Sequence, residues 1–301
     1  TDPLRVLMVA ARYLPDLGGI ETHIDEVARR INARPDVEVT ILATDRTRTR
    51  PRSELRHGVP VLRVPAWPRE RDYYLAPGVA QVVGDRGRWD VVHCHGVHTP
   101  VPPLAMVAAR RAGLPYLVTS HTGGHSMAHC NAVRSLQWRA VGPLLRRADA
   151  LIGVSRFEAE LLRRDAHLGD TPIRVIRNGG SLPAPDPAVS AVPGRVLTVG
   201  RLERYKGHHR VIEALPALRA IDPAFHVVVL GSGAYEPELR ALAERSGVAE
   251  HVQFRSLEPS DRQGMADELA SASVVAALSD YEAHPVAVME ALGAGRPVVG
   301  L

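Results

Sequence analysis

The sequence predicts an α/β protein made of two doubly wound, Rossmann-like domains. Apolar runs of strand length alternate with runs of helical spacing along the whole chain, a pattern typical of parallel sheets with helices on both faces. The strand-like runs are apolar almost throughout, as expected where helices bury both faces of a sheet. One stretch without periodicity, residues 181–193, contains four prolines and reads as a linker. We therefore predict domains at residues 1–180 and 194–301, joined by this linker.

The first domain begins with a strand at Leu4–Ala11, a loop containing Gly18-Gly19, and a helix at Ile20–Ile31. Ligands of doubly wound sheets bind beyond the carboxyl ends of the strands, so the residues that close each strand are candidate site residues. Apolar runs predict the remaining strands of this half at Val37–Ala43, Val59–Val64, Asp90–His95, Pro115–Ser120, Ala150–Val154 and Ile173–Ile176.

The second domain repeats the pattern, and its last predicted helix is short. Pro285 sits where this helix begins, because its fixed φ suits the first helical position and its missing N–H is not needed there. Gly293 and Gly295 close the helix. Apolar runs predict strands at Arg195–Gly200, Phe225–Leu230, His251–Phe254, Ser273–Leu278 and Pro297–Val299.

Composition excludes several classes of protein. The chain has 301 residues and is 45% hydrophobic, which suits two globular domains, and no apolar run approaches the ~18 residues of a membrane span. The run Leu4–Ala11 is too short for a signal peptide. Only two cysteines, Cys94 and Cys130, are present, so we expect no disulfide framework and a cytoplasmic location.

The net charge of the chain is modest, at +4, and the arginines are scattered along the sequence rather than clustered. Both observations argue against a nucleic-acid partner. Arginine pairs in the runs 108–111 and 144–147 leave two readings open: a solvated helix face, or peripheral contact with the inner face of the membrane. Nothing in the sequence indicates an oligomeric state.

Two glutamates flank the start of the short helix near the end of the chain. Glu282 lies in the strand-to-helix turn, and Glu290 lies more than one turn inside the helix. An eight-residue step rotates a helix by roughly 80° past two turns, so the two carboxylates should contact different parts of one extended ligand. The amides of the first turn, around Val286 and Ala287, add an anion site between them. Two glutamates at this spacing can also be plain solvated surface.

The Glu-x7-Glu element, placed between a strand and a helix and ending in Glu290-Ala291, resembles the signature of retaining GT-B glycosyltransferases of the family 4 type. The GT-B plan has two doubly wound domains facing each other across a cleft, and the resemblance covers the chain end to end. Relatives normally continue through several more helices beyond the position of Leu301, so we expect the C-terminal domain to be incomplete in this chain.

The resemblance implies a diphosphate site after the first strand of the second domain. Gly200-Arg201-Leu202 and Lys206-Gly207 match a family run that places an arginine and a lysine on the donor diphosphate, and Lys206 is the only lysine of the chain. The sequence has no Asp-x-Asp pair to hold Mg²⁺, so cations and helix N-termini must balance the charge of a departing diphosphate. A solvated basic loop is the alternative. Gly19, in a Gly-Gly-x-Glu segment, is expected near the donor phosphates by the same resemblance.

The resemblance also assigns the sugar and the nucleoside. It places Glu282 on the hydroxyls of the donor sugar, Glu290 on the ribose, and Gly231 and Gly233 where the backbone approaches the nucleotide. This chain departs from the family at Asn178-Gly179-Gly180-Ser181, where relatives have Asn-Gly-Val-Asp, and at His284, where relatives have an apolar residue.

Histidines gather where two strands of the first domain end. His121 matches the histidine that the family holds near the reacting sugar, although a hydrogen-bonded histidine capping the sheet is the alternative, as it is for His95. We predict no metal site, because His93 and His95 should point to opposite faces of their strand and the glutamate of a zincin motif is absent. The cluster of possible ligands comprises His93, His95, His98, His121, His125, His129 and Cys130.

The predicted function is therefore transfer of a sugar from a UDP-sugar or GDP-sugar to a hydroxyl acceptor, with retention, without a metal and without a cofactor. A nucleotide-sugar epimerase or hydrolase of the same fold, and a non-catalytic nucleotide-sugar-binding subunit, are the alternatives. The acceptor stays open between a saccharide, a lipid-linked and a small-molecule compound. The basic run with Arg46, Arg48, Arg50 and Arg52 is either a contact for a phosphorylated or lipid-linked acceptor or a mobile loop.

Overall fold

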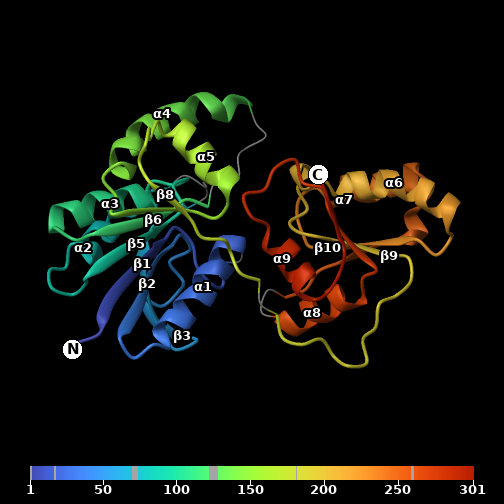
Figure 1. The fold of residues 1–301 in the computed structure, drawn as a ribbon, viewed down its shortest axis with the longest axis horizontal. Coiled ribbons are helices and arrows are strands. Elements are labelled where there is room, and N and C mark those ends of the chain that lie inside the picture. Colours follow the sequence, from blue (N-terminus) through green and yellow to red (C-terminus); the bar gives the residue numbers. More distant parts are fainter. Residues whose placement is uncertain (1, 17, 70–73, 122–127, 181, 259–260) are drawn as a thin grey trace. The chain divides into compact units, whose positions relative to one another are not determined.

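The chain folds into two α/β units, each of which is considered by itself (Figure 1). The structure is a computed structural model that describes residues 2–16, 18–69, 74–121, 128–180, 182–258 and 261–301, with the side chains of 128–136 left out. The first unit holds the described residues up to Asn178, and the second runs from Gly179 to Leu301. Residues 182–193 form no regular element and hydrogen-bond to the second unit, for example from the amide of Val192 to the carbonyl of Ser271. The predicted extent of the linker stays a prediction.

The first unit is an eight-stranded sheet of order β3-β4-β2-β1-β5-β6-β7-β8, parallel except between β3 and β4. Its elements are β1 (Leu4–Ala10), α1 (Gly19–Asn32), β2 (Val37–Asp45), β3 (Ser53–Arg56), β4 (Val59–Pro65), α2 (Gly78–Val83), β5 (Val91–His95), α3 (Val101–Ala112), β6 (Tyr116–Thr119), α4 (Ala128–Leu145), β7 (Ala150–Gly153), α5 (Arg156–Asp165) and β8 (Ile173–Val175).

The second unit is a five-stranded, wholly parallel sheet of order β11-β10-β9-β12-β13. Its elements are β9 (Arg195–Val199), η1 (Arg204–Lys206), α6 (His208–Ile221), β10 (His226–Leu230), α7 (Glu236–Arg245), η2 (Ala249–His251), β11 (Val252–Arg255), α8 (Arg262–Ser271), β12 (Val274–Ala277), α9 (Val286–Gly293) and β13 (Val298–Gly300). Every strand that the sequence predicts is present, with each end within two residues of the prediction. The prediction of two doubly wound, Rossmann-like units is confirmed.

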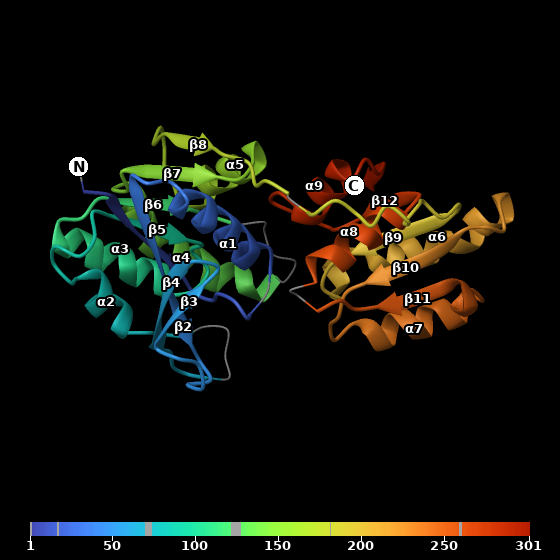
Figure 2. The same ribbon diagram turned by 90° about the horizontal axis from the view of Figure 1, so that it is seen from below.

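Successive strand residues fill the cores on opposite faces of each sheet, as the pleat requires. In β1, Leu7 and Val9 pack in one core, while Val6, Met8 and Ala10 pack in the other. In the second unit α6 and α7 cover one face of the sheet, and α8 and α9 cover the other (Figures 1 and 2). This double burial explains why the strands are apolar almost throughout.

Strand β3 was not predicted. It is polar and half exposed, and it pairs antiparallel with β4 at the edge of the sheet, so no apolar run identifies it. His57 and Gly58, both at positive φ (50° and 80°), form the two-residue turn of this hairpin. The basic run with Arg46, Arg48, Arg50 and Arg52 lies between β2 and this hairpin and forms no regular element.

Two smaller points concern the helices. Pro285 is the N-cap of α9, with φ −69° and ψ 117°, and the first helical residue is Val286, so the predicted start is wrong by one residue. Within the described parts of the chain, no helix has both the length and the apolar character that crossing a membrane requires.

Candidate functional site

The strand order of each unit fixes where a ligand site can form. In the first unit the chain moves outward from β1 in one direction and from β5 in the other, so the order reverses between these two strands. In the second unit it reverses between β9 and β12. Open α/β sheets bind ligands beyond the carboxyl ends of the strands at such a reversal. The residues after β9 and β12, and those after β1 and β5, are therefore the ones to examine.

Lys206 and Glu282 meet beyond the carboxyl ends of β9 and β12. The Lys206 ammonium forms an ion pair with Oε1 of Glu282, and both side chains stay partly open, at 19% and 28% exposed. Ser279 Oγ donates to the same carboxylate oxygen at 3.1 Å. The structure thus brings together the predicted phosphate lysine and the predicted sugar carboxylate.

The loop that carries Lys206 is held by groups that the sequence analysis missed. The buried His208 bonds to Thr198 Oγ1 through Nδ1 at 2.9 Å and to the carbonyl of Arg201 through Nε2 at 3.1 Å. Gly207 has φ 75°, and a Cβ there would collide with the carbonyl of Leu278. This glycine therefore allows the loop after β9 to pack against the end of β12.

Arg201 lies at the surface, 62% exposed, five residues before Lys206 in the sequence. Its guanidinium pairs with Glu203 at 2.7 Å and donates to the Tyr205 hydroxyl at 3.0 Å. Tyr205 stacks on Tyr281, with ring centroids 4.8 Å apart, and Tyr281 directly precedes Glu282. The sequence shows a tyrosine in each of these two loops, but neither the spacing nor the charge of the residues predicts that the two rings stack.

Glu290 is buried rather than presented to solvent. Its carboxylate is 5% exposed and accepts from Arg262 of α8 at 2.5 Å. Gly180 packs on the same helix, because a Cβ there would lie 2.9 Å from the Glu290 amide nitrogen. The glycine that replaces the family's usual residue therefore allows close contact with α9. The amides of Val286 and Ala287 belong to the first helical turn, which has no intrahelical acceptors for them.

Gly231 and Gly233 have a structural reason of their own. A Cβ at Gly231 would collide with the carbonyl of Gly200, and one at Gly233 would collide with the carbonyl of Leu202. Both glycines let the loop after β10 pack against the loop after β9 and so lie near the Lys206 segment. Their predicted approach to a nucleotide stays a prediction.

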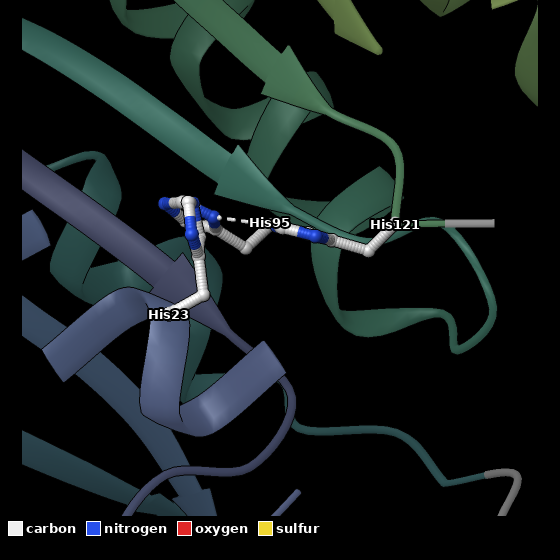
Figure 3. Close-up of side chains that lie close together, drawn as sticks. All are labelled: His23, His95 and His121. Atoms are coloured by element: carbon white, nitrogen blue, oxygen red, sulfur yellow. Dashed lines mark hydrogen bonds between the residues drawn. The ribbon is translucent and has the colours of Figure 1, made fainter. Parts of the chain in front are cut away.

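In the first unit three histidines from three elements converge (Figure 3). His95 closes β5, His121 follows β6, and His23 lies in α1. The distance from His95 Nδ1 to His121 Nε2 is 3.2 Å, and the ring of His23 meets that of His121 edge-on at 5.1 Å. The sequence analysis missed His23, whose only signal is its place four residues after Gly19 at the start of a helix.

The expectation that His93 and His95 point to opposite faces is wrong. Residues two apart in a strand share a face, and the centroids of these two rings lie 4.1 Å apart. His121 has φ 52°, a left-handed conformation that costs a non-glycine residue about 1–3 kcal/mol. His98 Nε2 lies 3.2 Å from the carbonyl oxygen of His121. The side chains of His125, His129 and Cys130 lie outside the described residues.

Burial keeps these imidazoles neutral. Loss of hydration lowers the pKa of His23, lowers that of His93 to about 4, and lowers those of His95 and His121 well below the ordinary value. At neutral pH each ring therefore has one unprotonated nitrogen.

Gly18 and Gly19 begin α1 near this cluster. Gly18 is the N-cap, and a Cβ on it would lie 2.6 Å from a carboxylate oxygen of the buried Glu21. A Cβ on Gly19 would meet no atom within 4 Å. Packing within the described residues therefore explains Gly18 but not Gly19, whose predicted role near donor phosphates stays a prediction.

His208 predicts a pH dependence of stability. Burial lowers the pKa of His208 to about 4, below the ~6.5 of an unfolded chain. Between these values the unfolded chain binds a proton that the folded chain does not, so stability is complete above pH ~6.5 and falls as pH drops toward 4, by up to ~1.4 kcal/mol per pH unit. Urea unfolding at pH 7.5 and 5.0 should show a smaller loss in H208Q than in the wild type. Equal losses in both proteins would contradict the assignment.

Comparisons with known proteins cover both units. Residues 18–179 match the family described as "Glycosyl transferase 4-like domain", and residues 190–301 match "Glycosyl transferases group 1". The chain is 27% identical, over 98% of its length and 74% of the relative's, to a GDP-mannose:cellobiosyl-diphosphopolyprenol alpha-mannosyltransferase of Komagataeibacter xylinus. It is 30% identical, over 98% of its length and 79% of the relative's, to a D-inositol 3-phosphate glycosyltransferase of Xylanimonas cellulosilytica. The crystal structure of Anabaena Alr3699/HepE in complex with UDP and glucose shares its fold, with a TM-score of 0.72, 20% identity, and coverage of 99% of this chain and 80% of that one.

Proposed function

The chain belongs to the glycosyltransferases that combine a glycosyl transferase 4-like domain with a group 1 domain, and from this premise we propose that it transfers a sugar with retention and without a metal. The donor is a nucleoside-diphosphate sugar, and the acceptor is a hydroxyl group. The observation that carries the proposal is the meeting of Lys206 and Glu282 beyond β9 and β12, at the strand-order reversal of the second unit.

The ion pair suits a donor that brings both a phosphate and a sugar. Without a ligand, the two charges neutralise each other. When the donor is bound, the Lys206 ammonium faces the diphosphate and the Glu282 carboxylate accepts from the sugar hydroxyls, so each charge gains a new partner. Arg201 and the amides of Val286 and Ala287 complete the phosphate site, because charge grows on the leaving group as the glycosidic bond breaks. Glu290 holds the ribose, beside Gly231 and Gly233.

Retention follows from attack on the face that the diphosphate leaves. The acceptor hydroxyl forms the new bond at the anomeric carbon as the bond to the β-phosphate breaks, and the leaving phosphate accepts the hydroxyl proton. His121 lies near the reacting sugar in this scheme, and Glu282 stabilises the positive charge that develops on the ring. No cofactor beyond the donor is required, and UDP-sugars and GDP-sugars are both candidates.

The anomeric configuration of the product, assigned by NMR, tests the reaction. We expect the configuration of the donor, and we expect EDTA to leave activity in place. Inversion would overturn the mechanism, and loss of activity in EDTA would overturn the metal-free part. The donor should also be incubated alone: complete epimerisation or hydrolysis at enzyme-like rates would favour the alternative enzymes, and tight donor binding with no product from any acceptor would favour a binding subunit.

A pocket in the first unit suggests the class of acceptor. It has a volume of about 430 Å³ and is lined by Arg48, Arg52, Trp67 and Leu75 among others. Trp67 is 67% exposed and Leu75 51% exposed, so the pocket offers cations beside an open apolar surface. The acceptors in the names of the two relatives above, a diphosphopolyprenol and an inositol 3-phosphate, both contain phosphate. We propose an acceptor with a phosphate group next to an apolar part.

The surrounding loop leaves two arginines for this role. Asp45 accepts from the amides of Thr47 and Arg50 and so shapes the loop. The guanidinium of Arg50 is held by Asp16 at 2.7–2.8 Å. Arg48 and Arg52 are exposed and, among the described residues, have no ion pair.

The double substitution R48A/R52A should raise the KM for a phosphorylated acceptor at least tenfold and leave the donor KM unchanged. Each lost hydrogen bond to a charged group costs ~1.5 kcal/mol of binding free energy, or somewhat less at an exposed site. A loss of ~1.4 kcal/mol weakens binding tenfold. Initial rates with varied acceptor at saturating donor measure the change. The control R34A removes an exposed arginine that pairs with Asp36 on the same unit and should have no effect. An unchanged acceptor KM in the double variant would place the acceptor elsewhere.

A further inference from the structure

The three converging histidines of the first unit have the composition of a metal site. His23, His95 and His121 each offer one ring nitrogen, and these nitrogens lie within 4.8 Å of one another (Figure 3). His23 lies in α1, His95 closes β5, and His121 lies two residues after the adjacent parallel strand β6. Two of the three ligands therefore lie on regular elements, which hold a site more firmly than loops do.

The spacing of the central pair matches that of two ligands on one ion. Zn²⁺ binds imidazole nitrogen at ~2.0–2.1 Å, and two ligands of a tetrahedral ion with these bond lengths lie ~3.3–3.4 Å apart. The separation of 3.2 Å between His95 Nδ1 and His121 Nε2 is close to this value. Without an ion, the two nitrogens can only share one proton. His23 is half-buried, and because the three nitrogens already lie within 4.8 Å of one another, it needs to approach by no more than ~1.4 Å to complete the set.

The buried His95 has one ring nitrogen that faces His121 and a second that has no partner in the described parts of the chain. Its side chain is 2% exposed, and its Nε2 has no hydrogen-bond partner among the described residues. A buried polar atom without a partner costs ~1–3 kcal/mol. An ion on Nδ1 would fix the proton of His95 on Nε2, so it would satisfy Nδ1 and leave Nε2 as an N–H donor.

We propose that His23, His95 and His121 bind one divalent transition-metal ion of the zinc type, and that the bound ion inhibits sugar transfer. The three neutral imidazoles leave a fourth position to water, as in other three-histidine zinc sites. Inhibition rests on the proposed function, because the ion occupies the lone pair of His121, the residue placed near the reacting sugar. Metal binding itself does not depend on that function.

Metal uptake is tested directly, without an activity assay. The EDTA-treated and dialysed protein is titrated with Co²⁺, whose tetrahedral complexes absorb visible light, and with Zn²⁺ in a calorimeter. We expect one ion per chain, and at least tenfold weaker binding in H23Q. The control H167N replaces an exposed histidine of the same unit at φ 51°, a conformation that asparagine tolerates, and it should bind as the wild type does. Failure of the wild type to take up either ion, or equal affinity of H23Q and wild type, would overturn the site.

Inhibition is measured as the ratio of activity in Zn²⁺ to activity in EDTA, so that each variant is its own reference. For the wild type and H167N, activity in Zn²⁺ should be at least tenfold lower than activity in EDTA. For H23Q the ratio of the two activities should stay near one. Uptake of one ion by a chain that transfers no sugar would leave the site standing and count against the proposed function. Activity that is lost in EDTA and restored by Zn²⁺ would overturn the inhibitory role and the metal-free mechanism together.

Discussion

Replacing Lys206 with alanine should lower kcat by at least tenfold. In other enzymes, loss of one preorganised hydrogen-bond donor lowers kcat by ~10²–10³, which corresponds to ~2.7–4 kcal/mol, and we expect the effect to approach this range. The physical reason is that charge on the β-phosphate grows as the glycosidic bond breaks, so the ammonium stabilises the transition state more than the bound donor. Steady-state rates at saturating donor and acceptor measure the effect. K206R should recover only part of the loss, because a planar guanidinium does not replace a compact ammonium in a fitted site.

Two comparisons make this result specific. R204A removes a positive charge from the same short helix, at an exposed position two residues away, and should leave kcat within about twofold of the wild type, since exposed charges contribute little. R201A should lower kcat by at least tenfold if Arg201 leaves Glu203 for the diphosphate. Circular dichroism must be unchanged in all variants. A K206A protein with wild-type kcat would mean that the ion pair with Glu282 is only structural.

Glu290 should affect binding of the donor rather than the rate of the chemical step. E290A should raise the donor KM by about 10- to 100-fold with little change in kcat, because ribose contacts are equal in the ground and transition states. The size follows from the ~1.5–3 kcal/mol of a hydrogen bond to a charged group. A kcat that fell as far as kcat/KM would instead place Glu290 on the reacting part of the donor.

Arg262 links this binding role to stability. R262A would leave the carboxylate of Glu290, which is 5% exposed, without its guanidinium partner. Removing one member of a buried pair costs ~3–5 kcal/mol, and because Arg262 is itself 35% exposed we expect ~2–3 kcal/mol in the free energy of unfolding, measured with urea. The matched control R240A breaks an exposed pair with Glu236 in the same unit and should cost less than ~0.5 kcal/mol. Equal costs in the two variants would show that burial of Glu290 has little energetic weight.

Most of the fold could be predicted from local sequence. The strands of both sheets were found because helices cover both faces, so that each strand is a nearly continuous apolar run between turn residues. Strand β3 escaped because it is a polar edge strand with one face to solvent. Lys206, Glu282 and Glu290 were singled out because they match motifs of the family that the sequence resembles, and such motifs are local patterns. Lys206 and Glu282 follow strands, and Glu290 lies inside the short helix.

The contacts of those residues could not be predicted in this way. Glu282 lies 76 residues from Lys206, and Arg262 lies 28 residues from Glu290. His23 joins His95 and His121 only because β1 and β6 both lie beside β5, which brings the start of α1 to the edge where β5 and β6 end. The sequence by itself determined which segments are strands and which residues close them, because burial on both faces of a sheet makes each strand an apolar run that is visible in the local sequence. Only the tertiary structure decided which closing residues meet, because strand order is set by packing of the whole sheet and leaves no local pattern.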